Sequence, residues 1–177
     1  DQSAHLELTR EIVRRFNYLY NKEVFPEPQA VYSKAKVLPG IDGRKMSKSY
    51  GNTIPFGASP EEMWNSIRMM TTDPGRIRKT DKGNPEVCIV DKFQKVFNEE
   101  EYESIVAQCK AGEIGCVQCK KCLNAKMNDM LKEIHERRVE LAQKPEYIRE
   151  VLAYGAERAQ KEAAKNMAEI KAAMNVL

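Results

Sequence analysis

A short basic run bounded by glycines constrains the fold of this sequence more than any other feature. The run is Lys45, Met46, Ser47, Lys48 and Ser49, with Gly40 and Gly43 before it and Gly51 after it. Glycines at this density disfavour helix and strand, and they predict a mobile loop. Two ammonium groups, two hydroxyl groups and the backbone N–H groups of such a loop suit a polyphosphate ligand. A solvated basic turn is the alternative that the residues alone leave open.

The composition indicates a soluble protein with a hydrophobic core. The 177 residues are 42% hydrophobic and 31% charged, which fits one domain or parts of two. No apolar run approaches the length of a membrane span and no signal peptide is recognisable, so we expect a cytoplasmic protein without membrane contact. Ten Lys and Arg face five Asp and Glu between residues 34 and 82. This basic stretch suits a phosphate-rich partner, although a solvated charged loop would have the same composition.

Helical periodicity dominates the rest of the chain, so we expect a mostly α fold. Residues 5–20 predict an amphipathic helix whose buried face carries Leu8, Ile12, Phe16 and Leu19. A second helix should begin at Ser59, with a capping box closed by Glu62 and a buried face of Met63, Ile67 and Met70. From residue 123 the pattern stays helical almost to the end, with Leu123, Met127, Met130, Ile134 and Leu141 on one face.

The segment 24–39 is predicted to be extended or looped rather than helical. Pro26 and Pro28 forbid a regular helix there. Its two short apolar pieces are candidate strands, and Val37 with Leu38 would lead the chain into the glycine-bounded loop.

Clustered cysteines predict a second functional site. Cys109, Cys116, Cys119 and Cys122 fall within fourteen residues, and Cys88 precedes them. A chain without a secretory signal rarely uses such cysteines for disulfides, so metal ligation is the better interpretation. A Cys-x-x-Cys turn directs two thiolates at one centre, and an all-sulfur site suits zinc or an iron–sulfur cluster. The spacing alone does not choose between these two.

The loop and its context resemble a known family. The string KMSKS behind a glycine-rich run is the signature loop of class I aminoacyl-tRNA synthetases. The start of the chain, Asp-Gln-x-x-His-x-Glu-Leu-Thr-Arg, followed by a helix and a Phe-Pro connection, resembles bacterial tryptophanyl-tRNA synthetases. The resemblance extends over essentially the whole chain. It implies that residues 1–55 are the C-terminal part of a Rossmann-type catalytic domain and that residues 56–177 form a helical anticodon-binding domain.

The resemblance also implies site residues and ligands. Lys45 and Lys48 would be the catalytic cations. ATP with magnesium would contact Asp1, Val37, Lys45, Met46, Ser47, Lys48 and Ser49, and Gln2 would lie near the tryptophan. The implied partners are tryptophan, ATP and tRNA-Trp, and the implied full-length enzyme is a homodimer.

A subset of the family carries a [4Fe-4S] cluster in the anticodon-binding domain, and the Ile-Gly-Cys-x-x-Cys-Lys-Lys context of this subset recurs at residues 114–121. The resemblance implies the ligands Cys88, Cys109, Cys116 and Cys119. Twenty residues separate Cys88 from Cys109, two fewer than in the subset, and Cys122 is extra to its pattern. Cys122 therefore remains an alternative fourth ligand, and zinc remains an alternative metal.

The family's HIGH-type motif does not occur in this sequence. We therefore expect a C-terminal fragment that does not activate tryptophan alone. Two other functions stay open: a non-catalytic tRNA- or metal-binding helical module with a vestigial loop, and a tyrosyl-tRNA synthetase.

Overall fold

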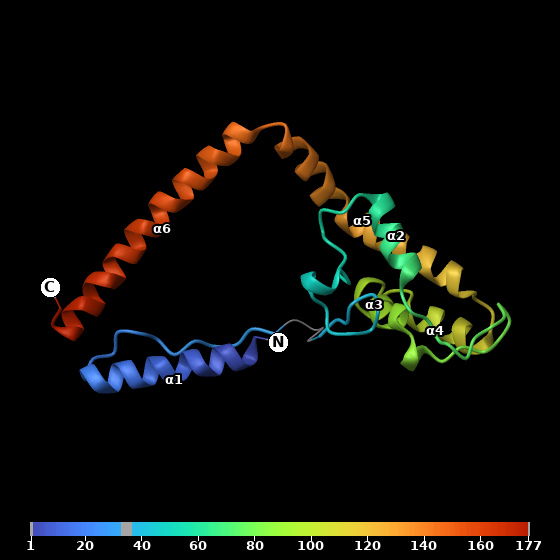
Figure 1. The fold of residues 1–177 in the computed structure, drawn as a ribbon, viewed down its shortest axis with the longest axis horizontal. Helices are drawn as coiled ribbons and strands as arrows, with labels where there is room; N and C mark the ends of the chain where they lie inside the picture. Colours follow the sequence, from blue (N-terminus) through green and yellow to red (C-terminus); the bar gives the residue numbers. More distant parts are fainter. Residues whose placement is uncertain (1, 33–36, 177) are drawn as a thin grey trace. The chain divides into compact units, whose positions relative to one another are not determined.

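The computed structural model describes residues 2–32 and 37–176 and consists mainly of helices (Figure 1). The order of elements is α1 (Ser3–Tyr20), the 3-10 turn η1 (Lys48–Tyr50), α2 (Pro60–Met69), the 3-10 turn η2 (Pro85–Val87), α3 (Ile89–Phe97), α4 (Tyr102–Ala111), α5 (Cys116–Ala142) and α6 (Pro145–Met174). The prediction of a mostly α chain is therefore confirmed. The contacts divide the chain into two compact units, residues 37–140 and residues 1–36 with 141–177.

The unit of residues 37–140 is built around a small hydrophobic core. Its buried members come from α2 and the residue after it, α3 and α5, and they are Met63, Ile67, Met70, Ile89, Val90, Phe93, Leu123, Met127 and Leu131. Phe93 is the largest fully buried side chain, and its ring stacks on Phe97 at a centroid distance of 6.0 Å. Leu38, Ile41, Met46 and Ile54 pack against this core, so the basic loop and its flanks rest on it.

The predicted start of the second helix is confirmed. The Ser59 side chain accepts a hydrogen bond from the Glu62 N–H at 3.2 Å, and the Glu62 carboxylate accepts one from the Ser59 N–H at 2.7 Å. This reciprocal pair satisfies two N–H groups that the first helical turn would otherwise leave unbonded. The pKa of Glu62 lies below its ordinary value, first because of the hydrogen bond from the Ser59 backbone.

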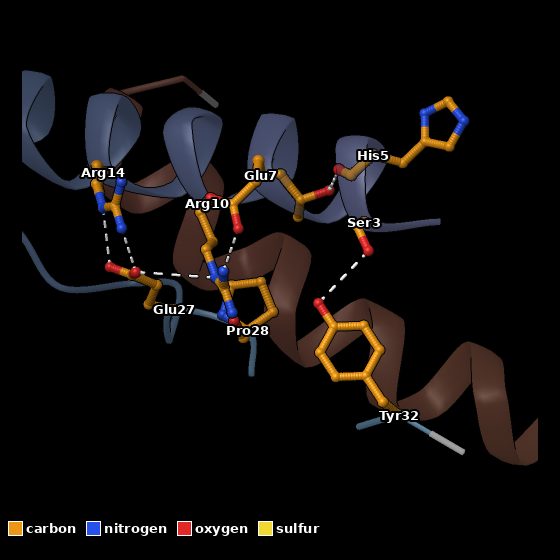
Figure 2. Close-up of polar contacts among 9 residues, drawn as sticks. Ser3, His5, Glu7, Arg10, Arg14, Glu27, Pro28 and Tyr32 are labelled. Atoms are coloured by element: carbon orange, nitrogen blue, oxygen red, sulfur yellow. Dashed lines mark hydrogen bonds and ion pairs between the residues drawn. The ribbon is translucent and has the colours of Figure 1, made fainter. Parts of the chain in front are cut away.

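In the other unit, the segment that follows α1 lies alongside this helix (Figure 2). The Asn17 side chain accepts hydrogen bonds from the N–H groups of Val24 and Phe25 and donates to the Phe25 carbonyl. Closer to the start of α1, Arg10 donates to the Pro28 carbonyl at 2.8 Å, and Arg14 forms a bidentate ion pair with Glu27. These contacts hold residues 24–28 extended along the helix.

Two predictions about the first forty residues are wrong. No β-strand forms among the described residues, and the only pairing of this type is an isolated bridge between Pro39 and Lys45. Val37 is 79% exposed instead of lying in a core strand, because no described strand lies beside it to pair with. On the face of α1 expected to be buried, Leu8, Ile12 and Leu19 are each more than half exposed, and only Phe16 is partly buried, with its ring 4.9 Å from that of Phe25.

No helix in the described parts of the chain has the combination of length and apolar content needed to cross a membrane. The boundary between two domains near residue 55 concerns the organisation of a whole synthetase and stays a prediction.

Candidate functional site: a basic loop and a cysteine site

The basic loop begins with a tight hairpin. The Gly40 N–H donates to the Arg44 carbonyl at 2.8 Å, and the Gly43 N–H donates to the Gly40 carbonyl at 2.9 Å. Gly43 has a φ of +83°, a backbone conformation that side chains other than glycine rarely adopt. The hairpin therefore returns the chain in the few residues available and delivers Lys45 to the start of the basic run.

The basic run itself is short and polar. The hydroxyl groups of Ser47 and Ser49 lie 2.7 Å apart, and Lys48 opens the single turn η1, which Gly51 ends with a φ of +63°. Lys45 and Lys48 are exposed, and no hydrogen bond or ion pair joins either ammonium group to another described residue. Both cations are therefore accessible to a ligand, as phosphate binding requires.

A buried asparagine after the run organises its backbone, and the sequence analysis missed it. Asn52 is only 2% exposed. Its Oδ1 accepts a hydrogen bond from the Ser47 N–H at 2.8 Å, and its Nδ2 donates to the Lys45 carbonyl at 3.1 Å and to the Asp42 carboxylate at 2.8 Å. The pKa of Asp42 is lowered, first by this hydrogen bond from Asn52 and also by Arg44. A polar residue directly after a glycine in a loop gives no sequence signal of burial.

The hairpin is also bonded to the helical core. The Thr71 N–H donates to the Ile41 carbonyl at 3.2 Å, and the Thr71 carbonyl accepts from the Ile89 N–H at 3.1 Å. On the side of the run, the Ile41 N–H donates to the Asn52 carbonyl at 3.0 Å. A continuous set of backbone bonds thus connects the loop to the start of α3.

The five residues of the run share one loop, and the structure does not test the contacts predicted for the other three ligand residues. Gln2 is exposed at the start of α1, in the other unit, and makes no side-chain cap there. Asp1 lies outside the described residues. Val37 is described and exposed. The roles of Asp1, Gln2 and Val37 in ligand binding therefore stay predictions.

The cysteine site is centred on Arg76. Its Nη1 lies 3.7 Å from the Cys109 Sγ and 3.9 Å from the Cys116 Sγ, and its Nη2 donates to the carbonyl groups of Lys79 and Ile114. The Nε of Arg76 is buried and has no hydrogen-bond partner among the described residues. The backbone at Gly83 lies close to the Cys109 thiol: a Cβ added at this position would be only 2.5 Å from the Cys109 Sγ.

Cys88 and Cys119 lie on the core side of this site. Both pack against the hydrophobic core, and the Gln94 Nε2 lies 3.5 Å from the Cys119 Sγ. Burial raises the pKa of Cys119 to about 12, against the hydrogen bond from Gln94, and the charges of Cys88 and Cys109 act on it in the same direction as burial. Burial also raises the pKa of Cys109, which Arg76 opposes and Cys88 and Cys116 reinforce.

In residues 2–32 and 37–176 no three His, Cys, Asp or Glu side chains are placed to hold a metal ion together. Cys122 is half-buried on α5 and has its neighbour Gln118, whose Nε2 lies 3.9 Å from its Sγ. Cys122 is one helical turn beyond Cys119, as the spacing predicts.

The glycine-bounded basic run is the loop expected of class I tRNA synthetases, and comparison with known proteins shows this family. The family model described as "tRNA synthetases class I (W and Y)" matches residues 1–132, and the chain belongs to this family. Over all of the chain it is 48% identical to the tryptophan–tRNA ligase of Thermotoga maritima, of which it covers 54%. It is 45% identical to the tryptophan–tRNA ligase of Aquifex aeolicus over 99% of the chain and 45% of that protein.

A solved structure shows the same similarity. Tryptophanyl-tRNA synthetase from Campylobacter jejuni, complexed with ADP and tryptophan, matches with a TM-score of 0.76 at 32% identity, covering 99% of this chain and 55% of that one. The chain spans about half the length of the curated relatives it matches.

Proposed function

We propose that this chain supplies the phosphate-binding loop and the tRNA-binding helical domain of a tryptophan–tRNA ligase. The observation that carries the proposal is the basic run, where two exposed lysines are mounted on a hairpin whose backbone is hydrogen-bonded to a buried asparagine and to the core. The names of the relatives favour tryptophan over tyrosine as the amino acid.

The chemistry of amino-acid activation explains what the lysines contribute. The tryptophan carboxylate attacks the α-phosphate of ATP, the bond to the leaving pyrophosphate breaks, and tryptophanyl-adenylate forms. A hydroxyl group at the tRNA 3′ end then attacks the acyl carbon and releases AMP. Negative charge grows on the phosphate oxygens in the first step, so fixed cations lower its barrier. We assign this role to Lys45 and Lys48, and phosphate contacts to Met46, Ser47 and Ser49 beside them.

The remaining assignments follow the family. Asp1 and Val37 contribute to the ATP site, Gln2 to the tryptophan site, and magnesium accompanies the nucleotide. Residues 1–55 complete a Rossmann-type catalytic domain, and residues 56–177 bind tRNA-Trp at the anticodon. The complete synthetase is a homodimer.

We expect activity when the chain is joined to the part of the Thermotoga maritima ligase that it does not cover. This joined synthetase should catalyse tryptophan-dependent ATP–pyrophosphate exchange and should charge tRNA-Trp. The chain alone should not, because it contains no HIGH-type sequence. Joined protein that folds, binds tRNA and lacks exchange would favour the non-catalytic module, and exchange that depends on tyrosine would favour a tyrosyl-tRNA synthetase.

We further propose that Cys88, Cys109, Cys116 and Cys119 hold a [4Fe-4S] cluster. The donor set fits an all-sulfur site, and Arg76 and Gln94 direct N–H groups at three of the four sulfurs. A four-iron cluster takes one thiolate at each iron, so its ligands stand further apart than the ligands of a single zinc ion. The support for the cluster is therefore the set of four thiols and the resemblance at residues 114–121, since no three such side chains in residues 2–32 and 37–176 are placed to hold one metal ion.

Anaerobically purified chain should be brown and should contain about four iron atoms per molecule. Cys116→Ser should lose the colour and the iron, because serine does not replace a thiolate at a cluster, whereas Cys122→Ser should retain both. Metal analysis and visible absorbance measure this result. A colourless protein with about one zinc per chain contradicts the cluster. If Cys122→Ser loses iron and Cys88→Ser keeps it, Cys122 is the fourth ligand.

A further inference from the structure

Asn52 is the most deeply buried polar residue near the basic run, and its contacts converge on that run. The side-chain amide bonds the peptide groups on both sides of Met46, at the Lys45 carbonyl and the Ser47 N–H. The same amide reaches the Asp42 carboxylate on the hairpin. A single side chain therefore ties together the hairpin and the start of the run.

The hairpin is shaped to admit this side chain. A Cβ at Gly40 would lie 2.2 Å from the Asn52 Nδ2 and 2.4 Å from its Cγ. Gly40 is therefore needed for the close approach of the asparagine, in contrast to Gly43 and Gly51, which are needed for their positive φ. The glycine before the run and the asparagine after it form one packed contact.

A buried amide that makes all these bonds has little freedom. Two bonds are to backbone groups of the run, one is to a carboxylate, and the Asn52 carbonyl holds the Ile41 N–H. Removing the amide would leave the Ser47 N–H and the Lys45 carbonyl without these partners, and the unbonded peptide groups would turn towards water. The directions in which Lys45 and Lys48 leave the backbone would change with them.

We propose that Asn52 is the positioning residue of the basic run, holding its backbone so that the Lys45 and Lys48 ammonium groups meet the phosphates of ATP together. The inference rests on the proposed function for its catalytic consequence, but its structural part stands independently. Asn52 is only 2% exposed, so we assign it no contact with the nucleotide. It acts through the peptide groups at Lys45 and Ser47, and the core bonds at Thr71 anchor the hairpin that it contacts.

The structural part is tested on the chain as it is, by amide hydrogen exchange. Asn52→Ala should make the Ser47 N–H exchange about tenfold faster, because its acceptor is gone. Asn98→Ala is the matched control, since Asn98 is also 2% exposed but donates to Gln94 and Glu101. Asn98→Ala should leave the Ser47 exchange unchanged. Unchanged Ser47 exchange in Asn52→Ala overturns the inference.

The catalytic part is tested in the joined synthetase. Asn52→Ala should lower kcat for ATP–pyrophosphate exchange about 100-fold per titrated active site, because displaced cations lose their alignment. The KM for tryptophan should stay unchanged. A purely structural role would instead reduce the number of active sites and leave kcat per site at the original value, as Asn98→Ala should do.

A pair of substitutions adds a rescue experiment. Asn52→Asp keeps an acceptor for the Ser47 N–H but places a second carboxylate beside Asp42, so kcat should fall. Adding Asp42→Asn should recover part of the loss, because a donor and an acceptor again face each other. An unsubstituted joined protein that folds and binds tRNA but lacks ATP–pyrophosphate exchange would reject the proposed function, and amide hydrogen exchange would then decide the role of Asn52. An active one whose kcat is insensitive to Asn52→Ala would reject the inference.

Discussion

Lys48→Ala in the joined synthetase should lower kcat for ATP–pyrophosphate exchange about 100- to 1000-fold, with the KM for tryptophan unchanged. The reason is that a fixed cation close to the leaving pyrophosphate stabilises charge that exists only in the transition state. Lys45→Ala should have an effect of the same kind, because both ammonium groups extend from the same short, anchored run.

Lys132 provides the control for this prediction. It is exposed on α5, as Lys45 and Lys48 are on the loop, and Lys132→Ala removes the same charge from a different surface. Steady-state exchange with varied ATP separates kcat from KM. If Lys45→Ala and Lys48→Ala both retain the original kcat, the loop is not a phosphate clamp.

The second large effect concerns the core below the loop. Phe93→Ala should lower the free energy of unfolding by about 3–5 kcal/mol, because the side chain is fully buried and its removal leaves a cavity. This loss is a large part of the stability of an ordinary domain, which is about 5–15 kcal/mol. The unit of residues 37–140 should therefore be largely unfolded, or should unfold at much lower denaturant concentration.

Phe56→Ala is the matched substitution, since this ring is 64% exposed in the same unit. It should change the free energy of unfolding by less than about 0.5 kcal/mol. Urea unfolding followed by helical circular dichroism measures both variants. Equal midpoints for Phe93→Ala and Phe56→Ala would show that α2, α3 and α5 are not held together by the core described here.

Local sequence signals predicted the elements that depend on local interactions. The capping box of Ser59 and Glu62 is present as expected, and Met63, Ile67 and Met70 are buried on the predicted face. Both results follow from residues three or four positions apart, where helical geometry alone decides which groups meet.

Burial and pairing were predicted less well, because they need a partner elsewhere. Periodicity found the apolar face of α1 but could not supply a surface to cover it, and Leu8 and Ile12 are exposed. On α5, Leu131 is buried in the core, whereas Met130, which was expected to be buried, is 52% exposed. The positions of α2 and α3 decide which face of α5 is covered. His135 on the same helix lies with its Nε2 3.0 Å from the Phe56 carbonyl, a contact across 79 residues that periodicity does not reveal.

The candidate site was predicted in part for the same reason. The basic run and the clustered cysteines are recognisable from residue types and spacing, and the ligand set proposed for the cysteines comes from the family resemblance. Asn52, Arg76 and Gln94 could not be recognised from the sequence. Arg76 and Gln94 contact cysteines that are distant in the sequence, and Asn52 contacts Ser47 only after the chain has formed a turn.

The Thr71 peptide group sets limits on how the length of this chain can vary. The Thr71 N–H donates to the carbonyl of Ile41 in the hairpin. The Thr71 carbonyl accepts from the N–H of Ile89, the residue after Cys88. An insertion or deletion at residue 71 would shift the register of the loop and of the cysteine site together. The turn at residues 99–101 between α3 and α4 is held differently, by side-chain ion pairs of Glu100 and Glu101 with Lys126. The segment around Thr71 must therefore keep its length, because its backbone bonds both sites.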